Sequence, residues 1–99
     1  MAPAREVQVE NNPAKHRYEA VVDGAVAGCA YYRERPGTVV ITHTEVGDEW
    51  EGQGVASSLI AGALDDIRAR GLTVTPFCAF TRGYIERHPE YADLVAAAR

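Results

Sequence analysis

The chain has 99 residues, of which 46% are hydrophobic and 24% charged, with a net charge of −4 and a pI near 5.3. These values fit one globular domain over residues 1–99 and argue against a general nucleic-acid-binding surface. No apolar run approaches the ~20 residues of a membrane span, and the N-terminal segment has no apolar signal core. We therefore expect a cytoplasmic protein with no membrane or nucleic-acid partner.

The first elements in chain order are predicted to be antiparallel strands. Apolar residues alternate over residues 7–9 and indicate a short strand that ends at an Asn-Asn-Pro segment. Asp23 and Gly24 then separate two apolar runs, which is a strong signal for a hairpin between residues 17–22 and 25–33.

A Pro36-Gly37 turn leads into the next predicted strand, Thr38–Val46. This segment is rich in β-branched residues, which favours a buried and central strand. The first half of the chain is therefore predicted to be a meander of about four strands.

The second half changes to a helical period. Apolar residues at helical spacing predict a helix that ends at Gly71. They are Val55, Leu59, Ile60, Ala63, Leu64 and Ile67. The strand expected at residues 72–76 should lie parallel to Thr38–Val46, because a crossover helix joins the two.

Residues 77–80 are predicted as a connection. Residues 81–99 are predicted as one or two short helices that are broken near Pro89, with Thr81 as the N-cap. Together these elements predict an α/β (α+β) domain: an antiparallel meander, a crossover helix, a further parallel strand and a helical tail.

The cysteine and histidine content is low. Cys29 and Cys78 are too few for a disulfide framework, and a reducing compartment would keep both as thiols. The three histidines are scattered, and neither cysteine has another metal ligand at a suitable spacing. We therefore expect no metal.

The segment EWEGQGVASS places Gly52 and Gly54 where the strand gives way to the helix. A tight turn alone would explain two glycines. However, the first amides of a helix lack intrahelical acceptors and glycines allow close backbone approach, so such a turn also suits a phosphate. The turn lacks the Lys-Ser/Thr of a P-loop and the full spacing of a dinucleotide fingerprint, which argues against a nucleoside triphosphate.

Residues 51–56, EGQGVA, resemble the Q/R-x-x-G-x-G/A pyrophosphate loop of the GNAT acetyltransferase superfamily. The blocks HTEV, GQGVAS and PFC…YIERHPEY are similar, in this order, to a short single-domain N-acetyltransferase-like subgroup of that superfamily. The resemblance covers about half of the chain. It implies a minimal GNAT fold without N-terminal helices, in which coenzyme A lies in a splay between two parallel strands. The chain departs from the motif at Glu51, where the family usually has Arg or Gln.

The resemblance also implies which residues would bind acetyl-CoA. The strand edge near Thr44 and Val46 would hold the pantetheine arm, and Arg82 would assist with phosphate charge, unless it is only a solvated cation. Backbone amides of the loop and first helical turn would cradle the pyrophosphate. They belong to Gly52, Gln53, Gly54, Val55 and Ala56.

Acetyl transfer to an amine requires a neutral amine, donors for the oxyanion and a proton for the departing thiolate. His43 and Glu45 alternate on one predicted strand and so face the same side, where His43 suits a general base. The alternative is a pair on the solvent face. The resemblance implies that Tyr84 protonates the thiolate and that Cys78 lies near the thioester, where it would accept the acetyl group. Packing in the core is the alternative for both.

The function predicted from these residues is an acyl-CoA-dependent N-acetyltransferase. The amine acceptor, a small molecule or a protein, is not specified, and the missing N-terminal helices leave room for a homodimer partner. One alternative is a coenzyme A or acyl-CoA binding module without efficient catalysis, which Glu51 and the acidic surface favour. Another is an interaction domain that keeps only the fold.

Overall fold

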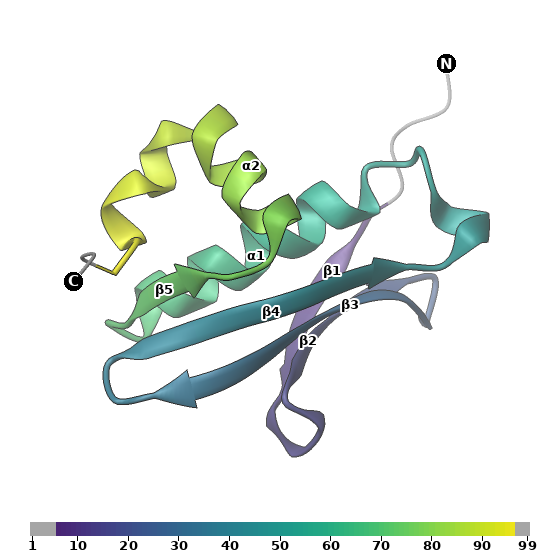
Figure 1. Ribbon diagram of the computed structural model, residues 1–99. Coiled ribbons are helices and arrows are strands. Elements are labelled where there is room, and N and C mark those ends of the chain that lie inside the picture. The colour runs from purple at the N-terminus through teal and green to yellow at the C-terminus, as the bar shows by residue number, and fades with distance from the viewer. Residues whose placement is uncertain (1–5, 97–99) are drawn as a thin grey trace.

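A computed structural model describes residues 6–96 as one five-stranded sheet with helices on one face (Figure 1). The strand order is β1-β2-β3-β4-β5, and only the last pair is parallel. The strands are β1 (Gln8–Asn12), β2 (Arg17–Val22), β3 (Ala25–Arg35), β4 (Thr38–Val46) and β5 (Thr73–Pro76). The α-helices are α1 (Val55–Ala69) and α2 (Ala79–Arg87), and the 3₁₀ turns are η1 (Pro13–Lys15), η2 (Asp48–Trp50) and η3 (Pro89–Leu94). The predicted meander, crossover helix and parallel strand are confirmed, and the helical tail is confirmed as far as Leu94. Val95 instead forms a parallel bridge with Val74, and residues 97–99 of the predicted tail lie outside the described residues.

The predicted hairpin between β2 and β3 is present. Its turn residues Asp23 and Gly24 have positive φ angles of 52° and 80°, as a tight hairpin turn requires. β3 is longer than the sequence predicted, because it continues past the first residue of β2 and pairs with β4 as far as Arg35.

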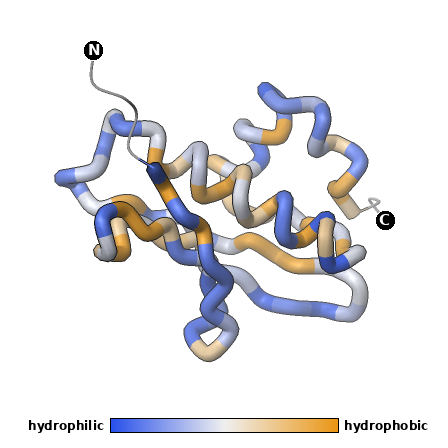
Figure 2. Tube along the Cα trace, turned by 180° about the vertical axis from the view of Figure 1, so that it is seen from behind, coloured by the Kyte–Doolittle hydropathy of each residue, from blue (hydrophilic) through white to orange (hydrophobic). Residues whose placement is uncertain are grey.

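The core lies between α1 and the face of the sheet that α1 covers. All six apolar residues that predicted the helix are buried in α1, and Figure 2 shows hydrophobic residues along α1 and the strands next to it. α1 packs closely on β1: a Cβ added at Gly62 would come within 2.6 Å of the Val9 side chain. The uncovered face of the sheet carries polar side chains such as Arg17, Glu19 and Tyr31.

The C-terminal end of α1 is closed, as Gly71 predicted. Gly71 has a φ of 73°, and the amides of Gly71 and Leu72 donate to the carbonyls of Arg68 and Ile67. This pattern is a Schellman motif, which satisfies carbonyls that the helix itself leaves free.

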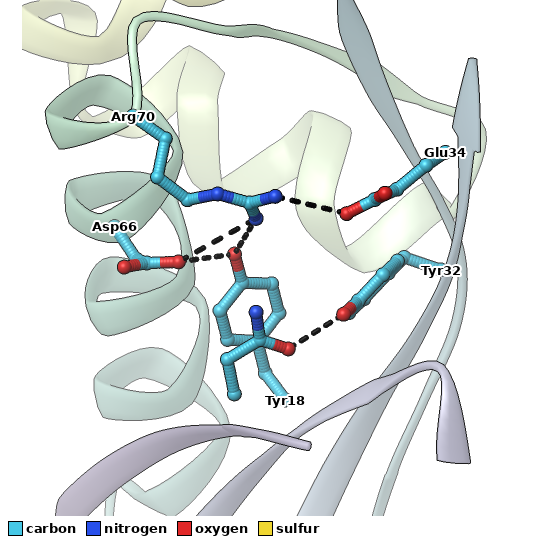
Figure 3. Close-up of polar contacts among 6 residues, drawn as sticks. Tyr18, Tyr32, Glu34, Asp66 and Arg70 are labelled. Atoms are coloured by element: carbon cyan, nitrogen blue, oxygen red, sulfur yellow. Dashed lines mark hydrogen bonds and ion pairs between the residues drawn. The ribbon is translucent and has the colours of Figure 1, made fainter. Parts of the chain in front are cut away.

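Side chains hold the same end of α1 to the sheet (Figure 3). The buried Tyr18 hydroxyl donates to Asp66 Oδ2 at 2.7 Å, and Arg70 bridges Tyr18 and Glu34 at 3.5 and 3.0 Å. Burial, followed by the contact with Asp66, raises the pKa of Tyr18 far above its usual value, so the tyrosine stays a hydrogen-bond donor.

β4 is central as predicted, but it is buried only in its first half. Val39 and Ile41 face α1 and are fully buried, whereas His43 and Glu45 are exposed. The pairing with β3 shifts by one residue at Thr42, because Ile41 lies opposite Tyr32 but His43 lies opposite Tyr31. Because of this β-bulge, Val39 and Ile41 face the helices before it, whereas Thr44 and Val46 face the helices after it.

α2 begins earlier than the sequence predicted. The expected N-cap, Thr81, is a fully buried residue inside the helix, and Cys78 occupies the N-cap position instead. The end of the helix before Pro89 is as predicted, since α2 stops at Arg87 and η3 begins at Pro89.

Within residues 6–96, no helix is long and apolar enough to cross a membrane. The same described residues contain no group of three or more His, Cys, Asp or Glu side chains placed to hold a metal ion.

Candidate functional site

The N-terminal end of α1 is open, in contrast to its C-terminal end. Gly52 and Gly54 both have left-handed backbone angles, with φ of 80° and 77°, and Gly54 is the N-cap without a side-chain capping bond. The first intrahelical bond runs from Ser58 N to Gly54 O at 3.0 Å. The amides of the preceding residues therefore have no acceptor within the helix, so this end suits an anion.

A cavity of about 370 Å³ lies in front of this turn. Its lining includes Glu51, Gly52, Gly54, residues 55–57 at the start of α1, Val46 of β4, Trp50 of η2, and Phe80 of α2. A Cβ added at Gly52 or Gly54 would meet nothing within 4 Å, so the space beside both glycines is open to a ligand. The Glu51 side chain is exposed at the same cavity, and its carboxylate opposes the charge of an anionic ligand.

β4 and β5 separate on the side of this cavity. Their pairing runs from Thr38 opposite Thr73 to Ile41 opposite Pro76, where β5 ends, whereas β4 continues to Val46. Cys78 N donates to Ile41 O at 2.9 Å and marks the last backbone contact at this fork. The edge of β4 that includes Thr44 and Val46 therefore extends beyond its parallel neighbour.

Cys78 lies at the apex of the fork. Its Sγ is 3.4 Å from Thr44 Oγ1, because the bulge turns Thr44 toward the helices. Burial acts to raise the pKa of the Cys78 thiol, but hydrogen bonds from the Thr44 hydroxyl and from the amides of Thr81 and Phe80 outweigh it, so the pKa lies below its usual value. The Thr81 hydroxyl is fully buried and has no hydrogen-bond partner within the described part of the chain.

His43 and Glu45 face the opposite side of β4. As the alternation predicted, they lie together, with His43 Nε2 3.1 Å from Glu45 Oε2. More than half of each side chain is exposed, and the imidazole stacks on the ring of Tyr31 with centroids 6.2 Å apart. Of the candidate catalytic residues, His43 and Glu45 therefore lie together on one face of β4, whereas Cys78 lies on the other side of this strand, in contact with Thr44.

Tyr84 is buried in α2 and does not line the cavity. Its ring stacks on His88 at 4.1 Å and lies 6.1 Å from the ring of Tyr91. Burial, followed by the charges of Glu90 and Asp65, raises the pKa of Tyr84 above its usual value. A raised pKa keeps the phenol protonated, as a general acid must be.

Two polar side chains of the predicted acetyl-CoA site contact backbone carbonyls. Arg82 donates to the carbonyls of Pro76 and Phe77 at 3.2 and 2.6 Å, which braces the connection between β5 and α2. Gln53 Nε2 donates to Glu49 O at 3.0 Å and braces the turn before α1.

The sequence did not identify Phe80 as a residue of the cavity, because residues 77–80 were expected to form a connection. A second cavity, of about 260 Å³, was also missed. It opens at the other side of Val46 and Trp50, with Cys29, Glu45 and Glu49 in its lining. An aromatic residue two positions after Cys78 was a signal in the sequence for the first of these features.

Solved structures share this fold. A GCN5-like protein from Staphylococcus aureus superposes with a TM-score of 0.69, at 21% identity over 93% of this chain and 90% of that chain. A ribosomal-protein-alanine N-acetyltransferase from Brucella melitensis biovar Abortus 2308 superposes with a TM-score of 0.51, at 22% identity over 84% of this chain and 62% of that chain. The fold is that of the GNAT acetyltransferases.

The sequence comparisons define the family. The family model described as GCN5-related N-acetyl-transferase matches residues 17–94. Protein NATD1 of Xenopus tropicalis is 26% identical over an alignment of 91 residues, and the alignment covers 90% of this chain and 84% of that protein. The chain belongs to the GCN5-related N-acetyltransferase family.

Proposed function

We propose that the protein transfers an acetyl group from acetyl-CoA to an amine. The observation that carries the proposal is the open, uncapped start of α1, which borders a cavity beside the fork between β4 and β5. Free amides at residues 52–56 suit a pyrophosphate, and the unpaired β4 edge at Thr44 and Val46 suits the amides of a pantetheine arm. Acetyl-CoA would supply an activated thioester.

Residues on β4 and α2 would divide the chemistry. His43, oriented by Glu45, would take a proton from the acceptor amine on the open face of the sheet. Tyr84, protonated at neutral pH, would give a proton to the departing thiolate if its hydroxyl reaches the fork in the bound state. Arg82 would add positive charge near the phosphates if it leaves the carbonyls that it contacts here.

Cys78 offers a two-step route. Its thiolate would attack the thioester carbon, the bond between the acetyl group and coenzyme A would break, and coenzyme A would leave with a proton. The amine would then attack the S-acetyl group and release the Cys78 thiol. The lowered pKa of Cys78 and its position at the N-terminal end of α2 support this role.

A direct test combines binding, turnover and intact mass. We expect coenzyme A to bind in calorimetry, and a panel of amines to include one that releases thiol from acetyl-CoA. Acetyl-CoA without acceptor should add one acetyl mass to the wild-type chain and none to Cys78→Ala. No added mass, or an added acetyl group that persists in Cys78→Ala, would leave direct transfer as the route.

A second function, binding of coenzyme A without efficient catalysis, is favoured by Glu51. Its carboxylate lines the cavity that would hold the pyrophosphate. Calorimetric binding of coenzyme A without thiol release across amine and peptide acceptors would identify this function. Absence of any coenzyme A binding would contradict both.

A further inference from the structure

A notch lies beside the last residues of β3, at the end of the sheet remote from the Gly54 turn. The fifteen residues of α1 separate the two places by roughly 22 Å along the helix axis. β3 pairs with β2 only as far as Tyr31, yet pairs with β4 up to Arg35. Figure 1 shows the final part of β3 beside β4 alone, while the chain before β2 turns away.

This notch is a cavity of about 530 Å³, and it is lined by His16 and residues 32–35. Beyond Tyr32, the backbone of β3 has no strand partner on this side. Tyr32 N donates to His16 O at 2.9 Å, which shows that the Tyr32 amide points toward the β2 side. Because backbone groups alternate along a strand, the N–H and C=O of Glu34 point the same way, beyond the start of β2. Within residues 6–96, no strand lies opposite Glu34 on that side.

Two positive charges flank this free edge. Arg33 and Arg35 are exposed and share the uncovered face of the sheet, two residues apart. Neither side chain has a hydrogen-bond or ion-pair partner within the described part of the chain. The carboxylate of Glu34, on the other face, is engaged by Arg70 at 3.0 Å. The notch is thus a positive site in a chain whose net charge is −4.

We propose that this notch binds an extended peptide with acidic residues at alternate positions, which adds to the free edge of β3 as a further strand. The N–H and C=O of Glu34 exchange hydrogen bonds with one peptide residue. Acidic side chains two residues apart in the peptide then meet Arg33 and Arg35. Main-chain pairing gives the affinity in this mode, and the side chains on alternate positions give the specificity.

The charges of Arg33 and Arg35 also predict which peptides do not bind in the notch. Charged side chains on a free strand edge discourage pairing with apolar strands. Since Arg33 and Arg35 have the same sign, they repel a basic strand and attract an acidic one. A free phosphate or a nucleic acid would use the arginines but not the strand edge, so the backbone contact distinguishes these ligands from a peptide.

The test measures anisotropy of a fluorescent Glu-Val-Glu-Val-Glu-Val peptide with the full chain, and compares it with the matching Lys-Val peptide. We expect saturable binding of the acidic peptide alone. The Arg33→Gln/Arg35→Gln variant should bind at least about tenfold more weakly. Arg87→Gln, an exposed arginine on α2, is the matched control and should bind like wild type.

A second pair of variants tests whether the peptide pairs with the backbone of β3. Glu34→Pro removes the N–H, whereas Glu34→Ala keeps it and loses the same ion pair with Arg70. We expect Glu34→Pro to abolish binding and Glu34→Ala to retain it. If Glu34→Pro does not fold, slower exchange of the Glu34 amide of the wild-type chain with bound peptide is the equivalent readout.

Three outcomes would overturn the proposal. They are absence of binding at millimolar peptide, equal binding of the Lys-Val peptide, and equal binding by Glu34→Pro and Glu34→Ala with unchanged exchange of the Glu34 amide. Equal competition by pyrophosphate or single-stranded DNA, together with the last result, would identify an anion site instead.

Discussion

The two ends of α1 satisfy their backbone groups in different ways. At the C-terminal end, the amides of Gly71 and Leu72 and the side chains of Tyr18 and Arg70 close the helix against the sheet. At the N-terminal end, Gly54 provides no capping side chain, and a cavity faces the free amides.

The difference indicates how a small domain divides stability and function. Helix ends without caps cost stability, and a side-chain cap contributes about 1 kcal/mol. A capping side chain at Gly54 would occupy the amides that an anion needs. The chain therefore anchors α1 through Asp66 and Arg70 and leaves its first turn available. If this comparison is correct, changes at the two ends should separate ligand binding from folding stability.

The largest effect is expected for Gly54→Val. The branched side chain enters the space in front of the free amides, and we expect coenzyme A to bind about 100-fold more weakly in calorimetry. Gly37→Val is a matched control, because Gly37 also has a positive φ, 79°, and open space around its Cβ position. Both variants should lose stability from backbone strain, by about 1–3 kcal/mol. Unchanged coenzyme A affinity in a folded Gly54→Val variant would refute the placement of the pyrophosphate.

Tyr18→Phe probes the closed end. It removes the hydroxyl that donates to Asp66, and we expect the free energy of unfolding to fall by about 1–2 kcal/mol in urea denaturation. Affinity for coenzyme A should stay within about twofold of wild type, since the change lies at the other end of α1. A parallel loss of coenzyme A affinity would mean that the two ends are coupled.

Glu51→Arg tests the effect of charge at the open N-terminal end of α1. Replacing a carboxylate at the cavity by a cation should tighten coenzyme A binding by about tenfold at low salt, and by less as salt screens the charge. Glu10→Arg on β1 makes the same change of charge away from the cavity and serves as the control. Equal affinity of Glu51→Arg and wild type would show that the Glu51 carboxylate does not face the ligand.

The smallest effect concerns the two thiols. The pKa of Cys78 is lowered by its hydrogen bonds, whereas burial raises the pKa of Cys29. Because the thiolate is the reactive form, alkylation by iodoacetamide should reach its midpoint at a lower pH for Cys78 than for Cys29, as read by peptide mass spectrometry. Thr44→Val removes one donor and should move the Cys78 midpoint to higher pH, with Thr42→Val as the control. Identical midpoints for the two cysteines would contradict the assigned environments.

The sequence predicted the elements that depend on local signals. The turn at Asp23 and Gly24, the six apolar positions of α1 and the stop at Gly71 all follow from backbone preference or periodicity, and the structure confirms them. The pairing of His43 with Glu45 followed from alternation within one strand.

The features that the sequence did not predict depend on contacts between distant segments. The bulge at Thr42 arises from the register of β4 against β3, and it turns Thr44 toward Cys78. Thr81 is the better capping residue by preference, but Cys78 precedes the helix because its amide pairs with Ile41. The contact between Tyr18 and Asp66 joins residues 48 apart in sequence.

The most direct test of the account is amide NMR of the full chain titrated with coenzyme A. The account predicts that shift changes concentrate at residues 52–57 of the open turn and at residues 43–46 of β4, while residues 66–71 and 33–35 stay unchanged. Absence of shifts, or shifts centred on the closed end of α1, would contradict the claim that the open end is the acetyl-CoA site.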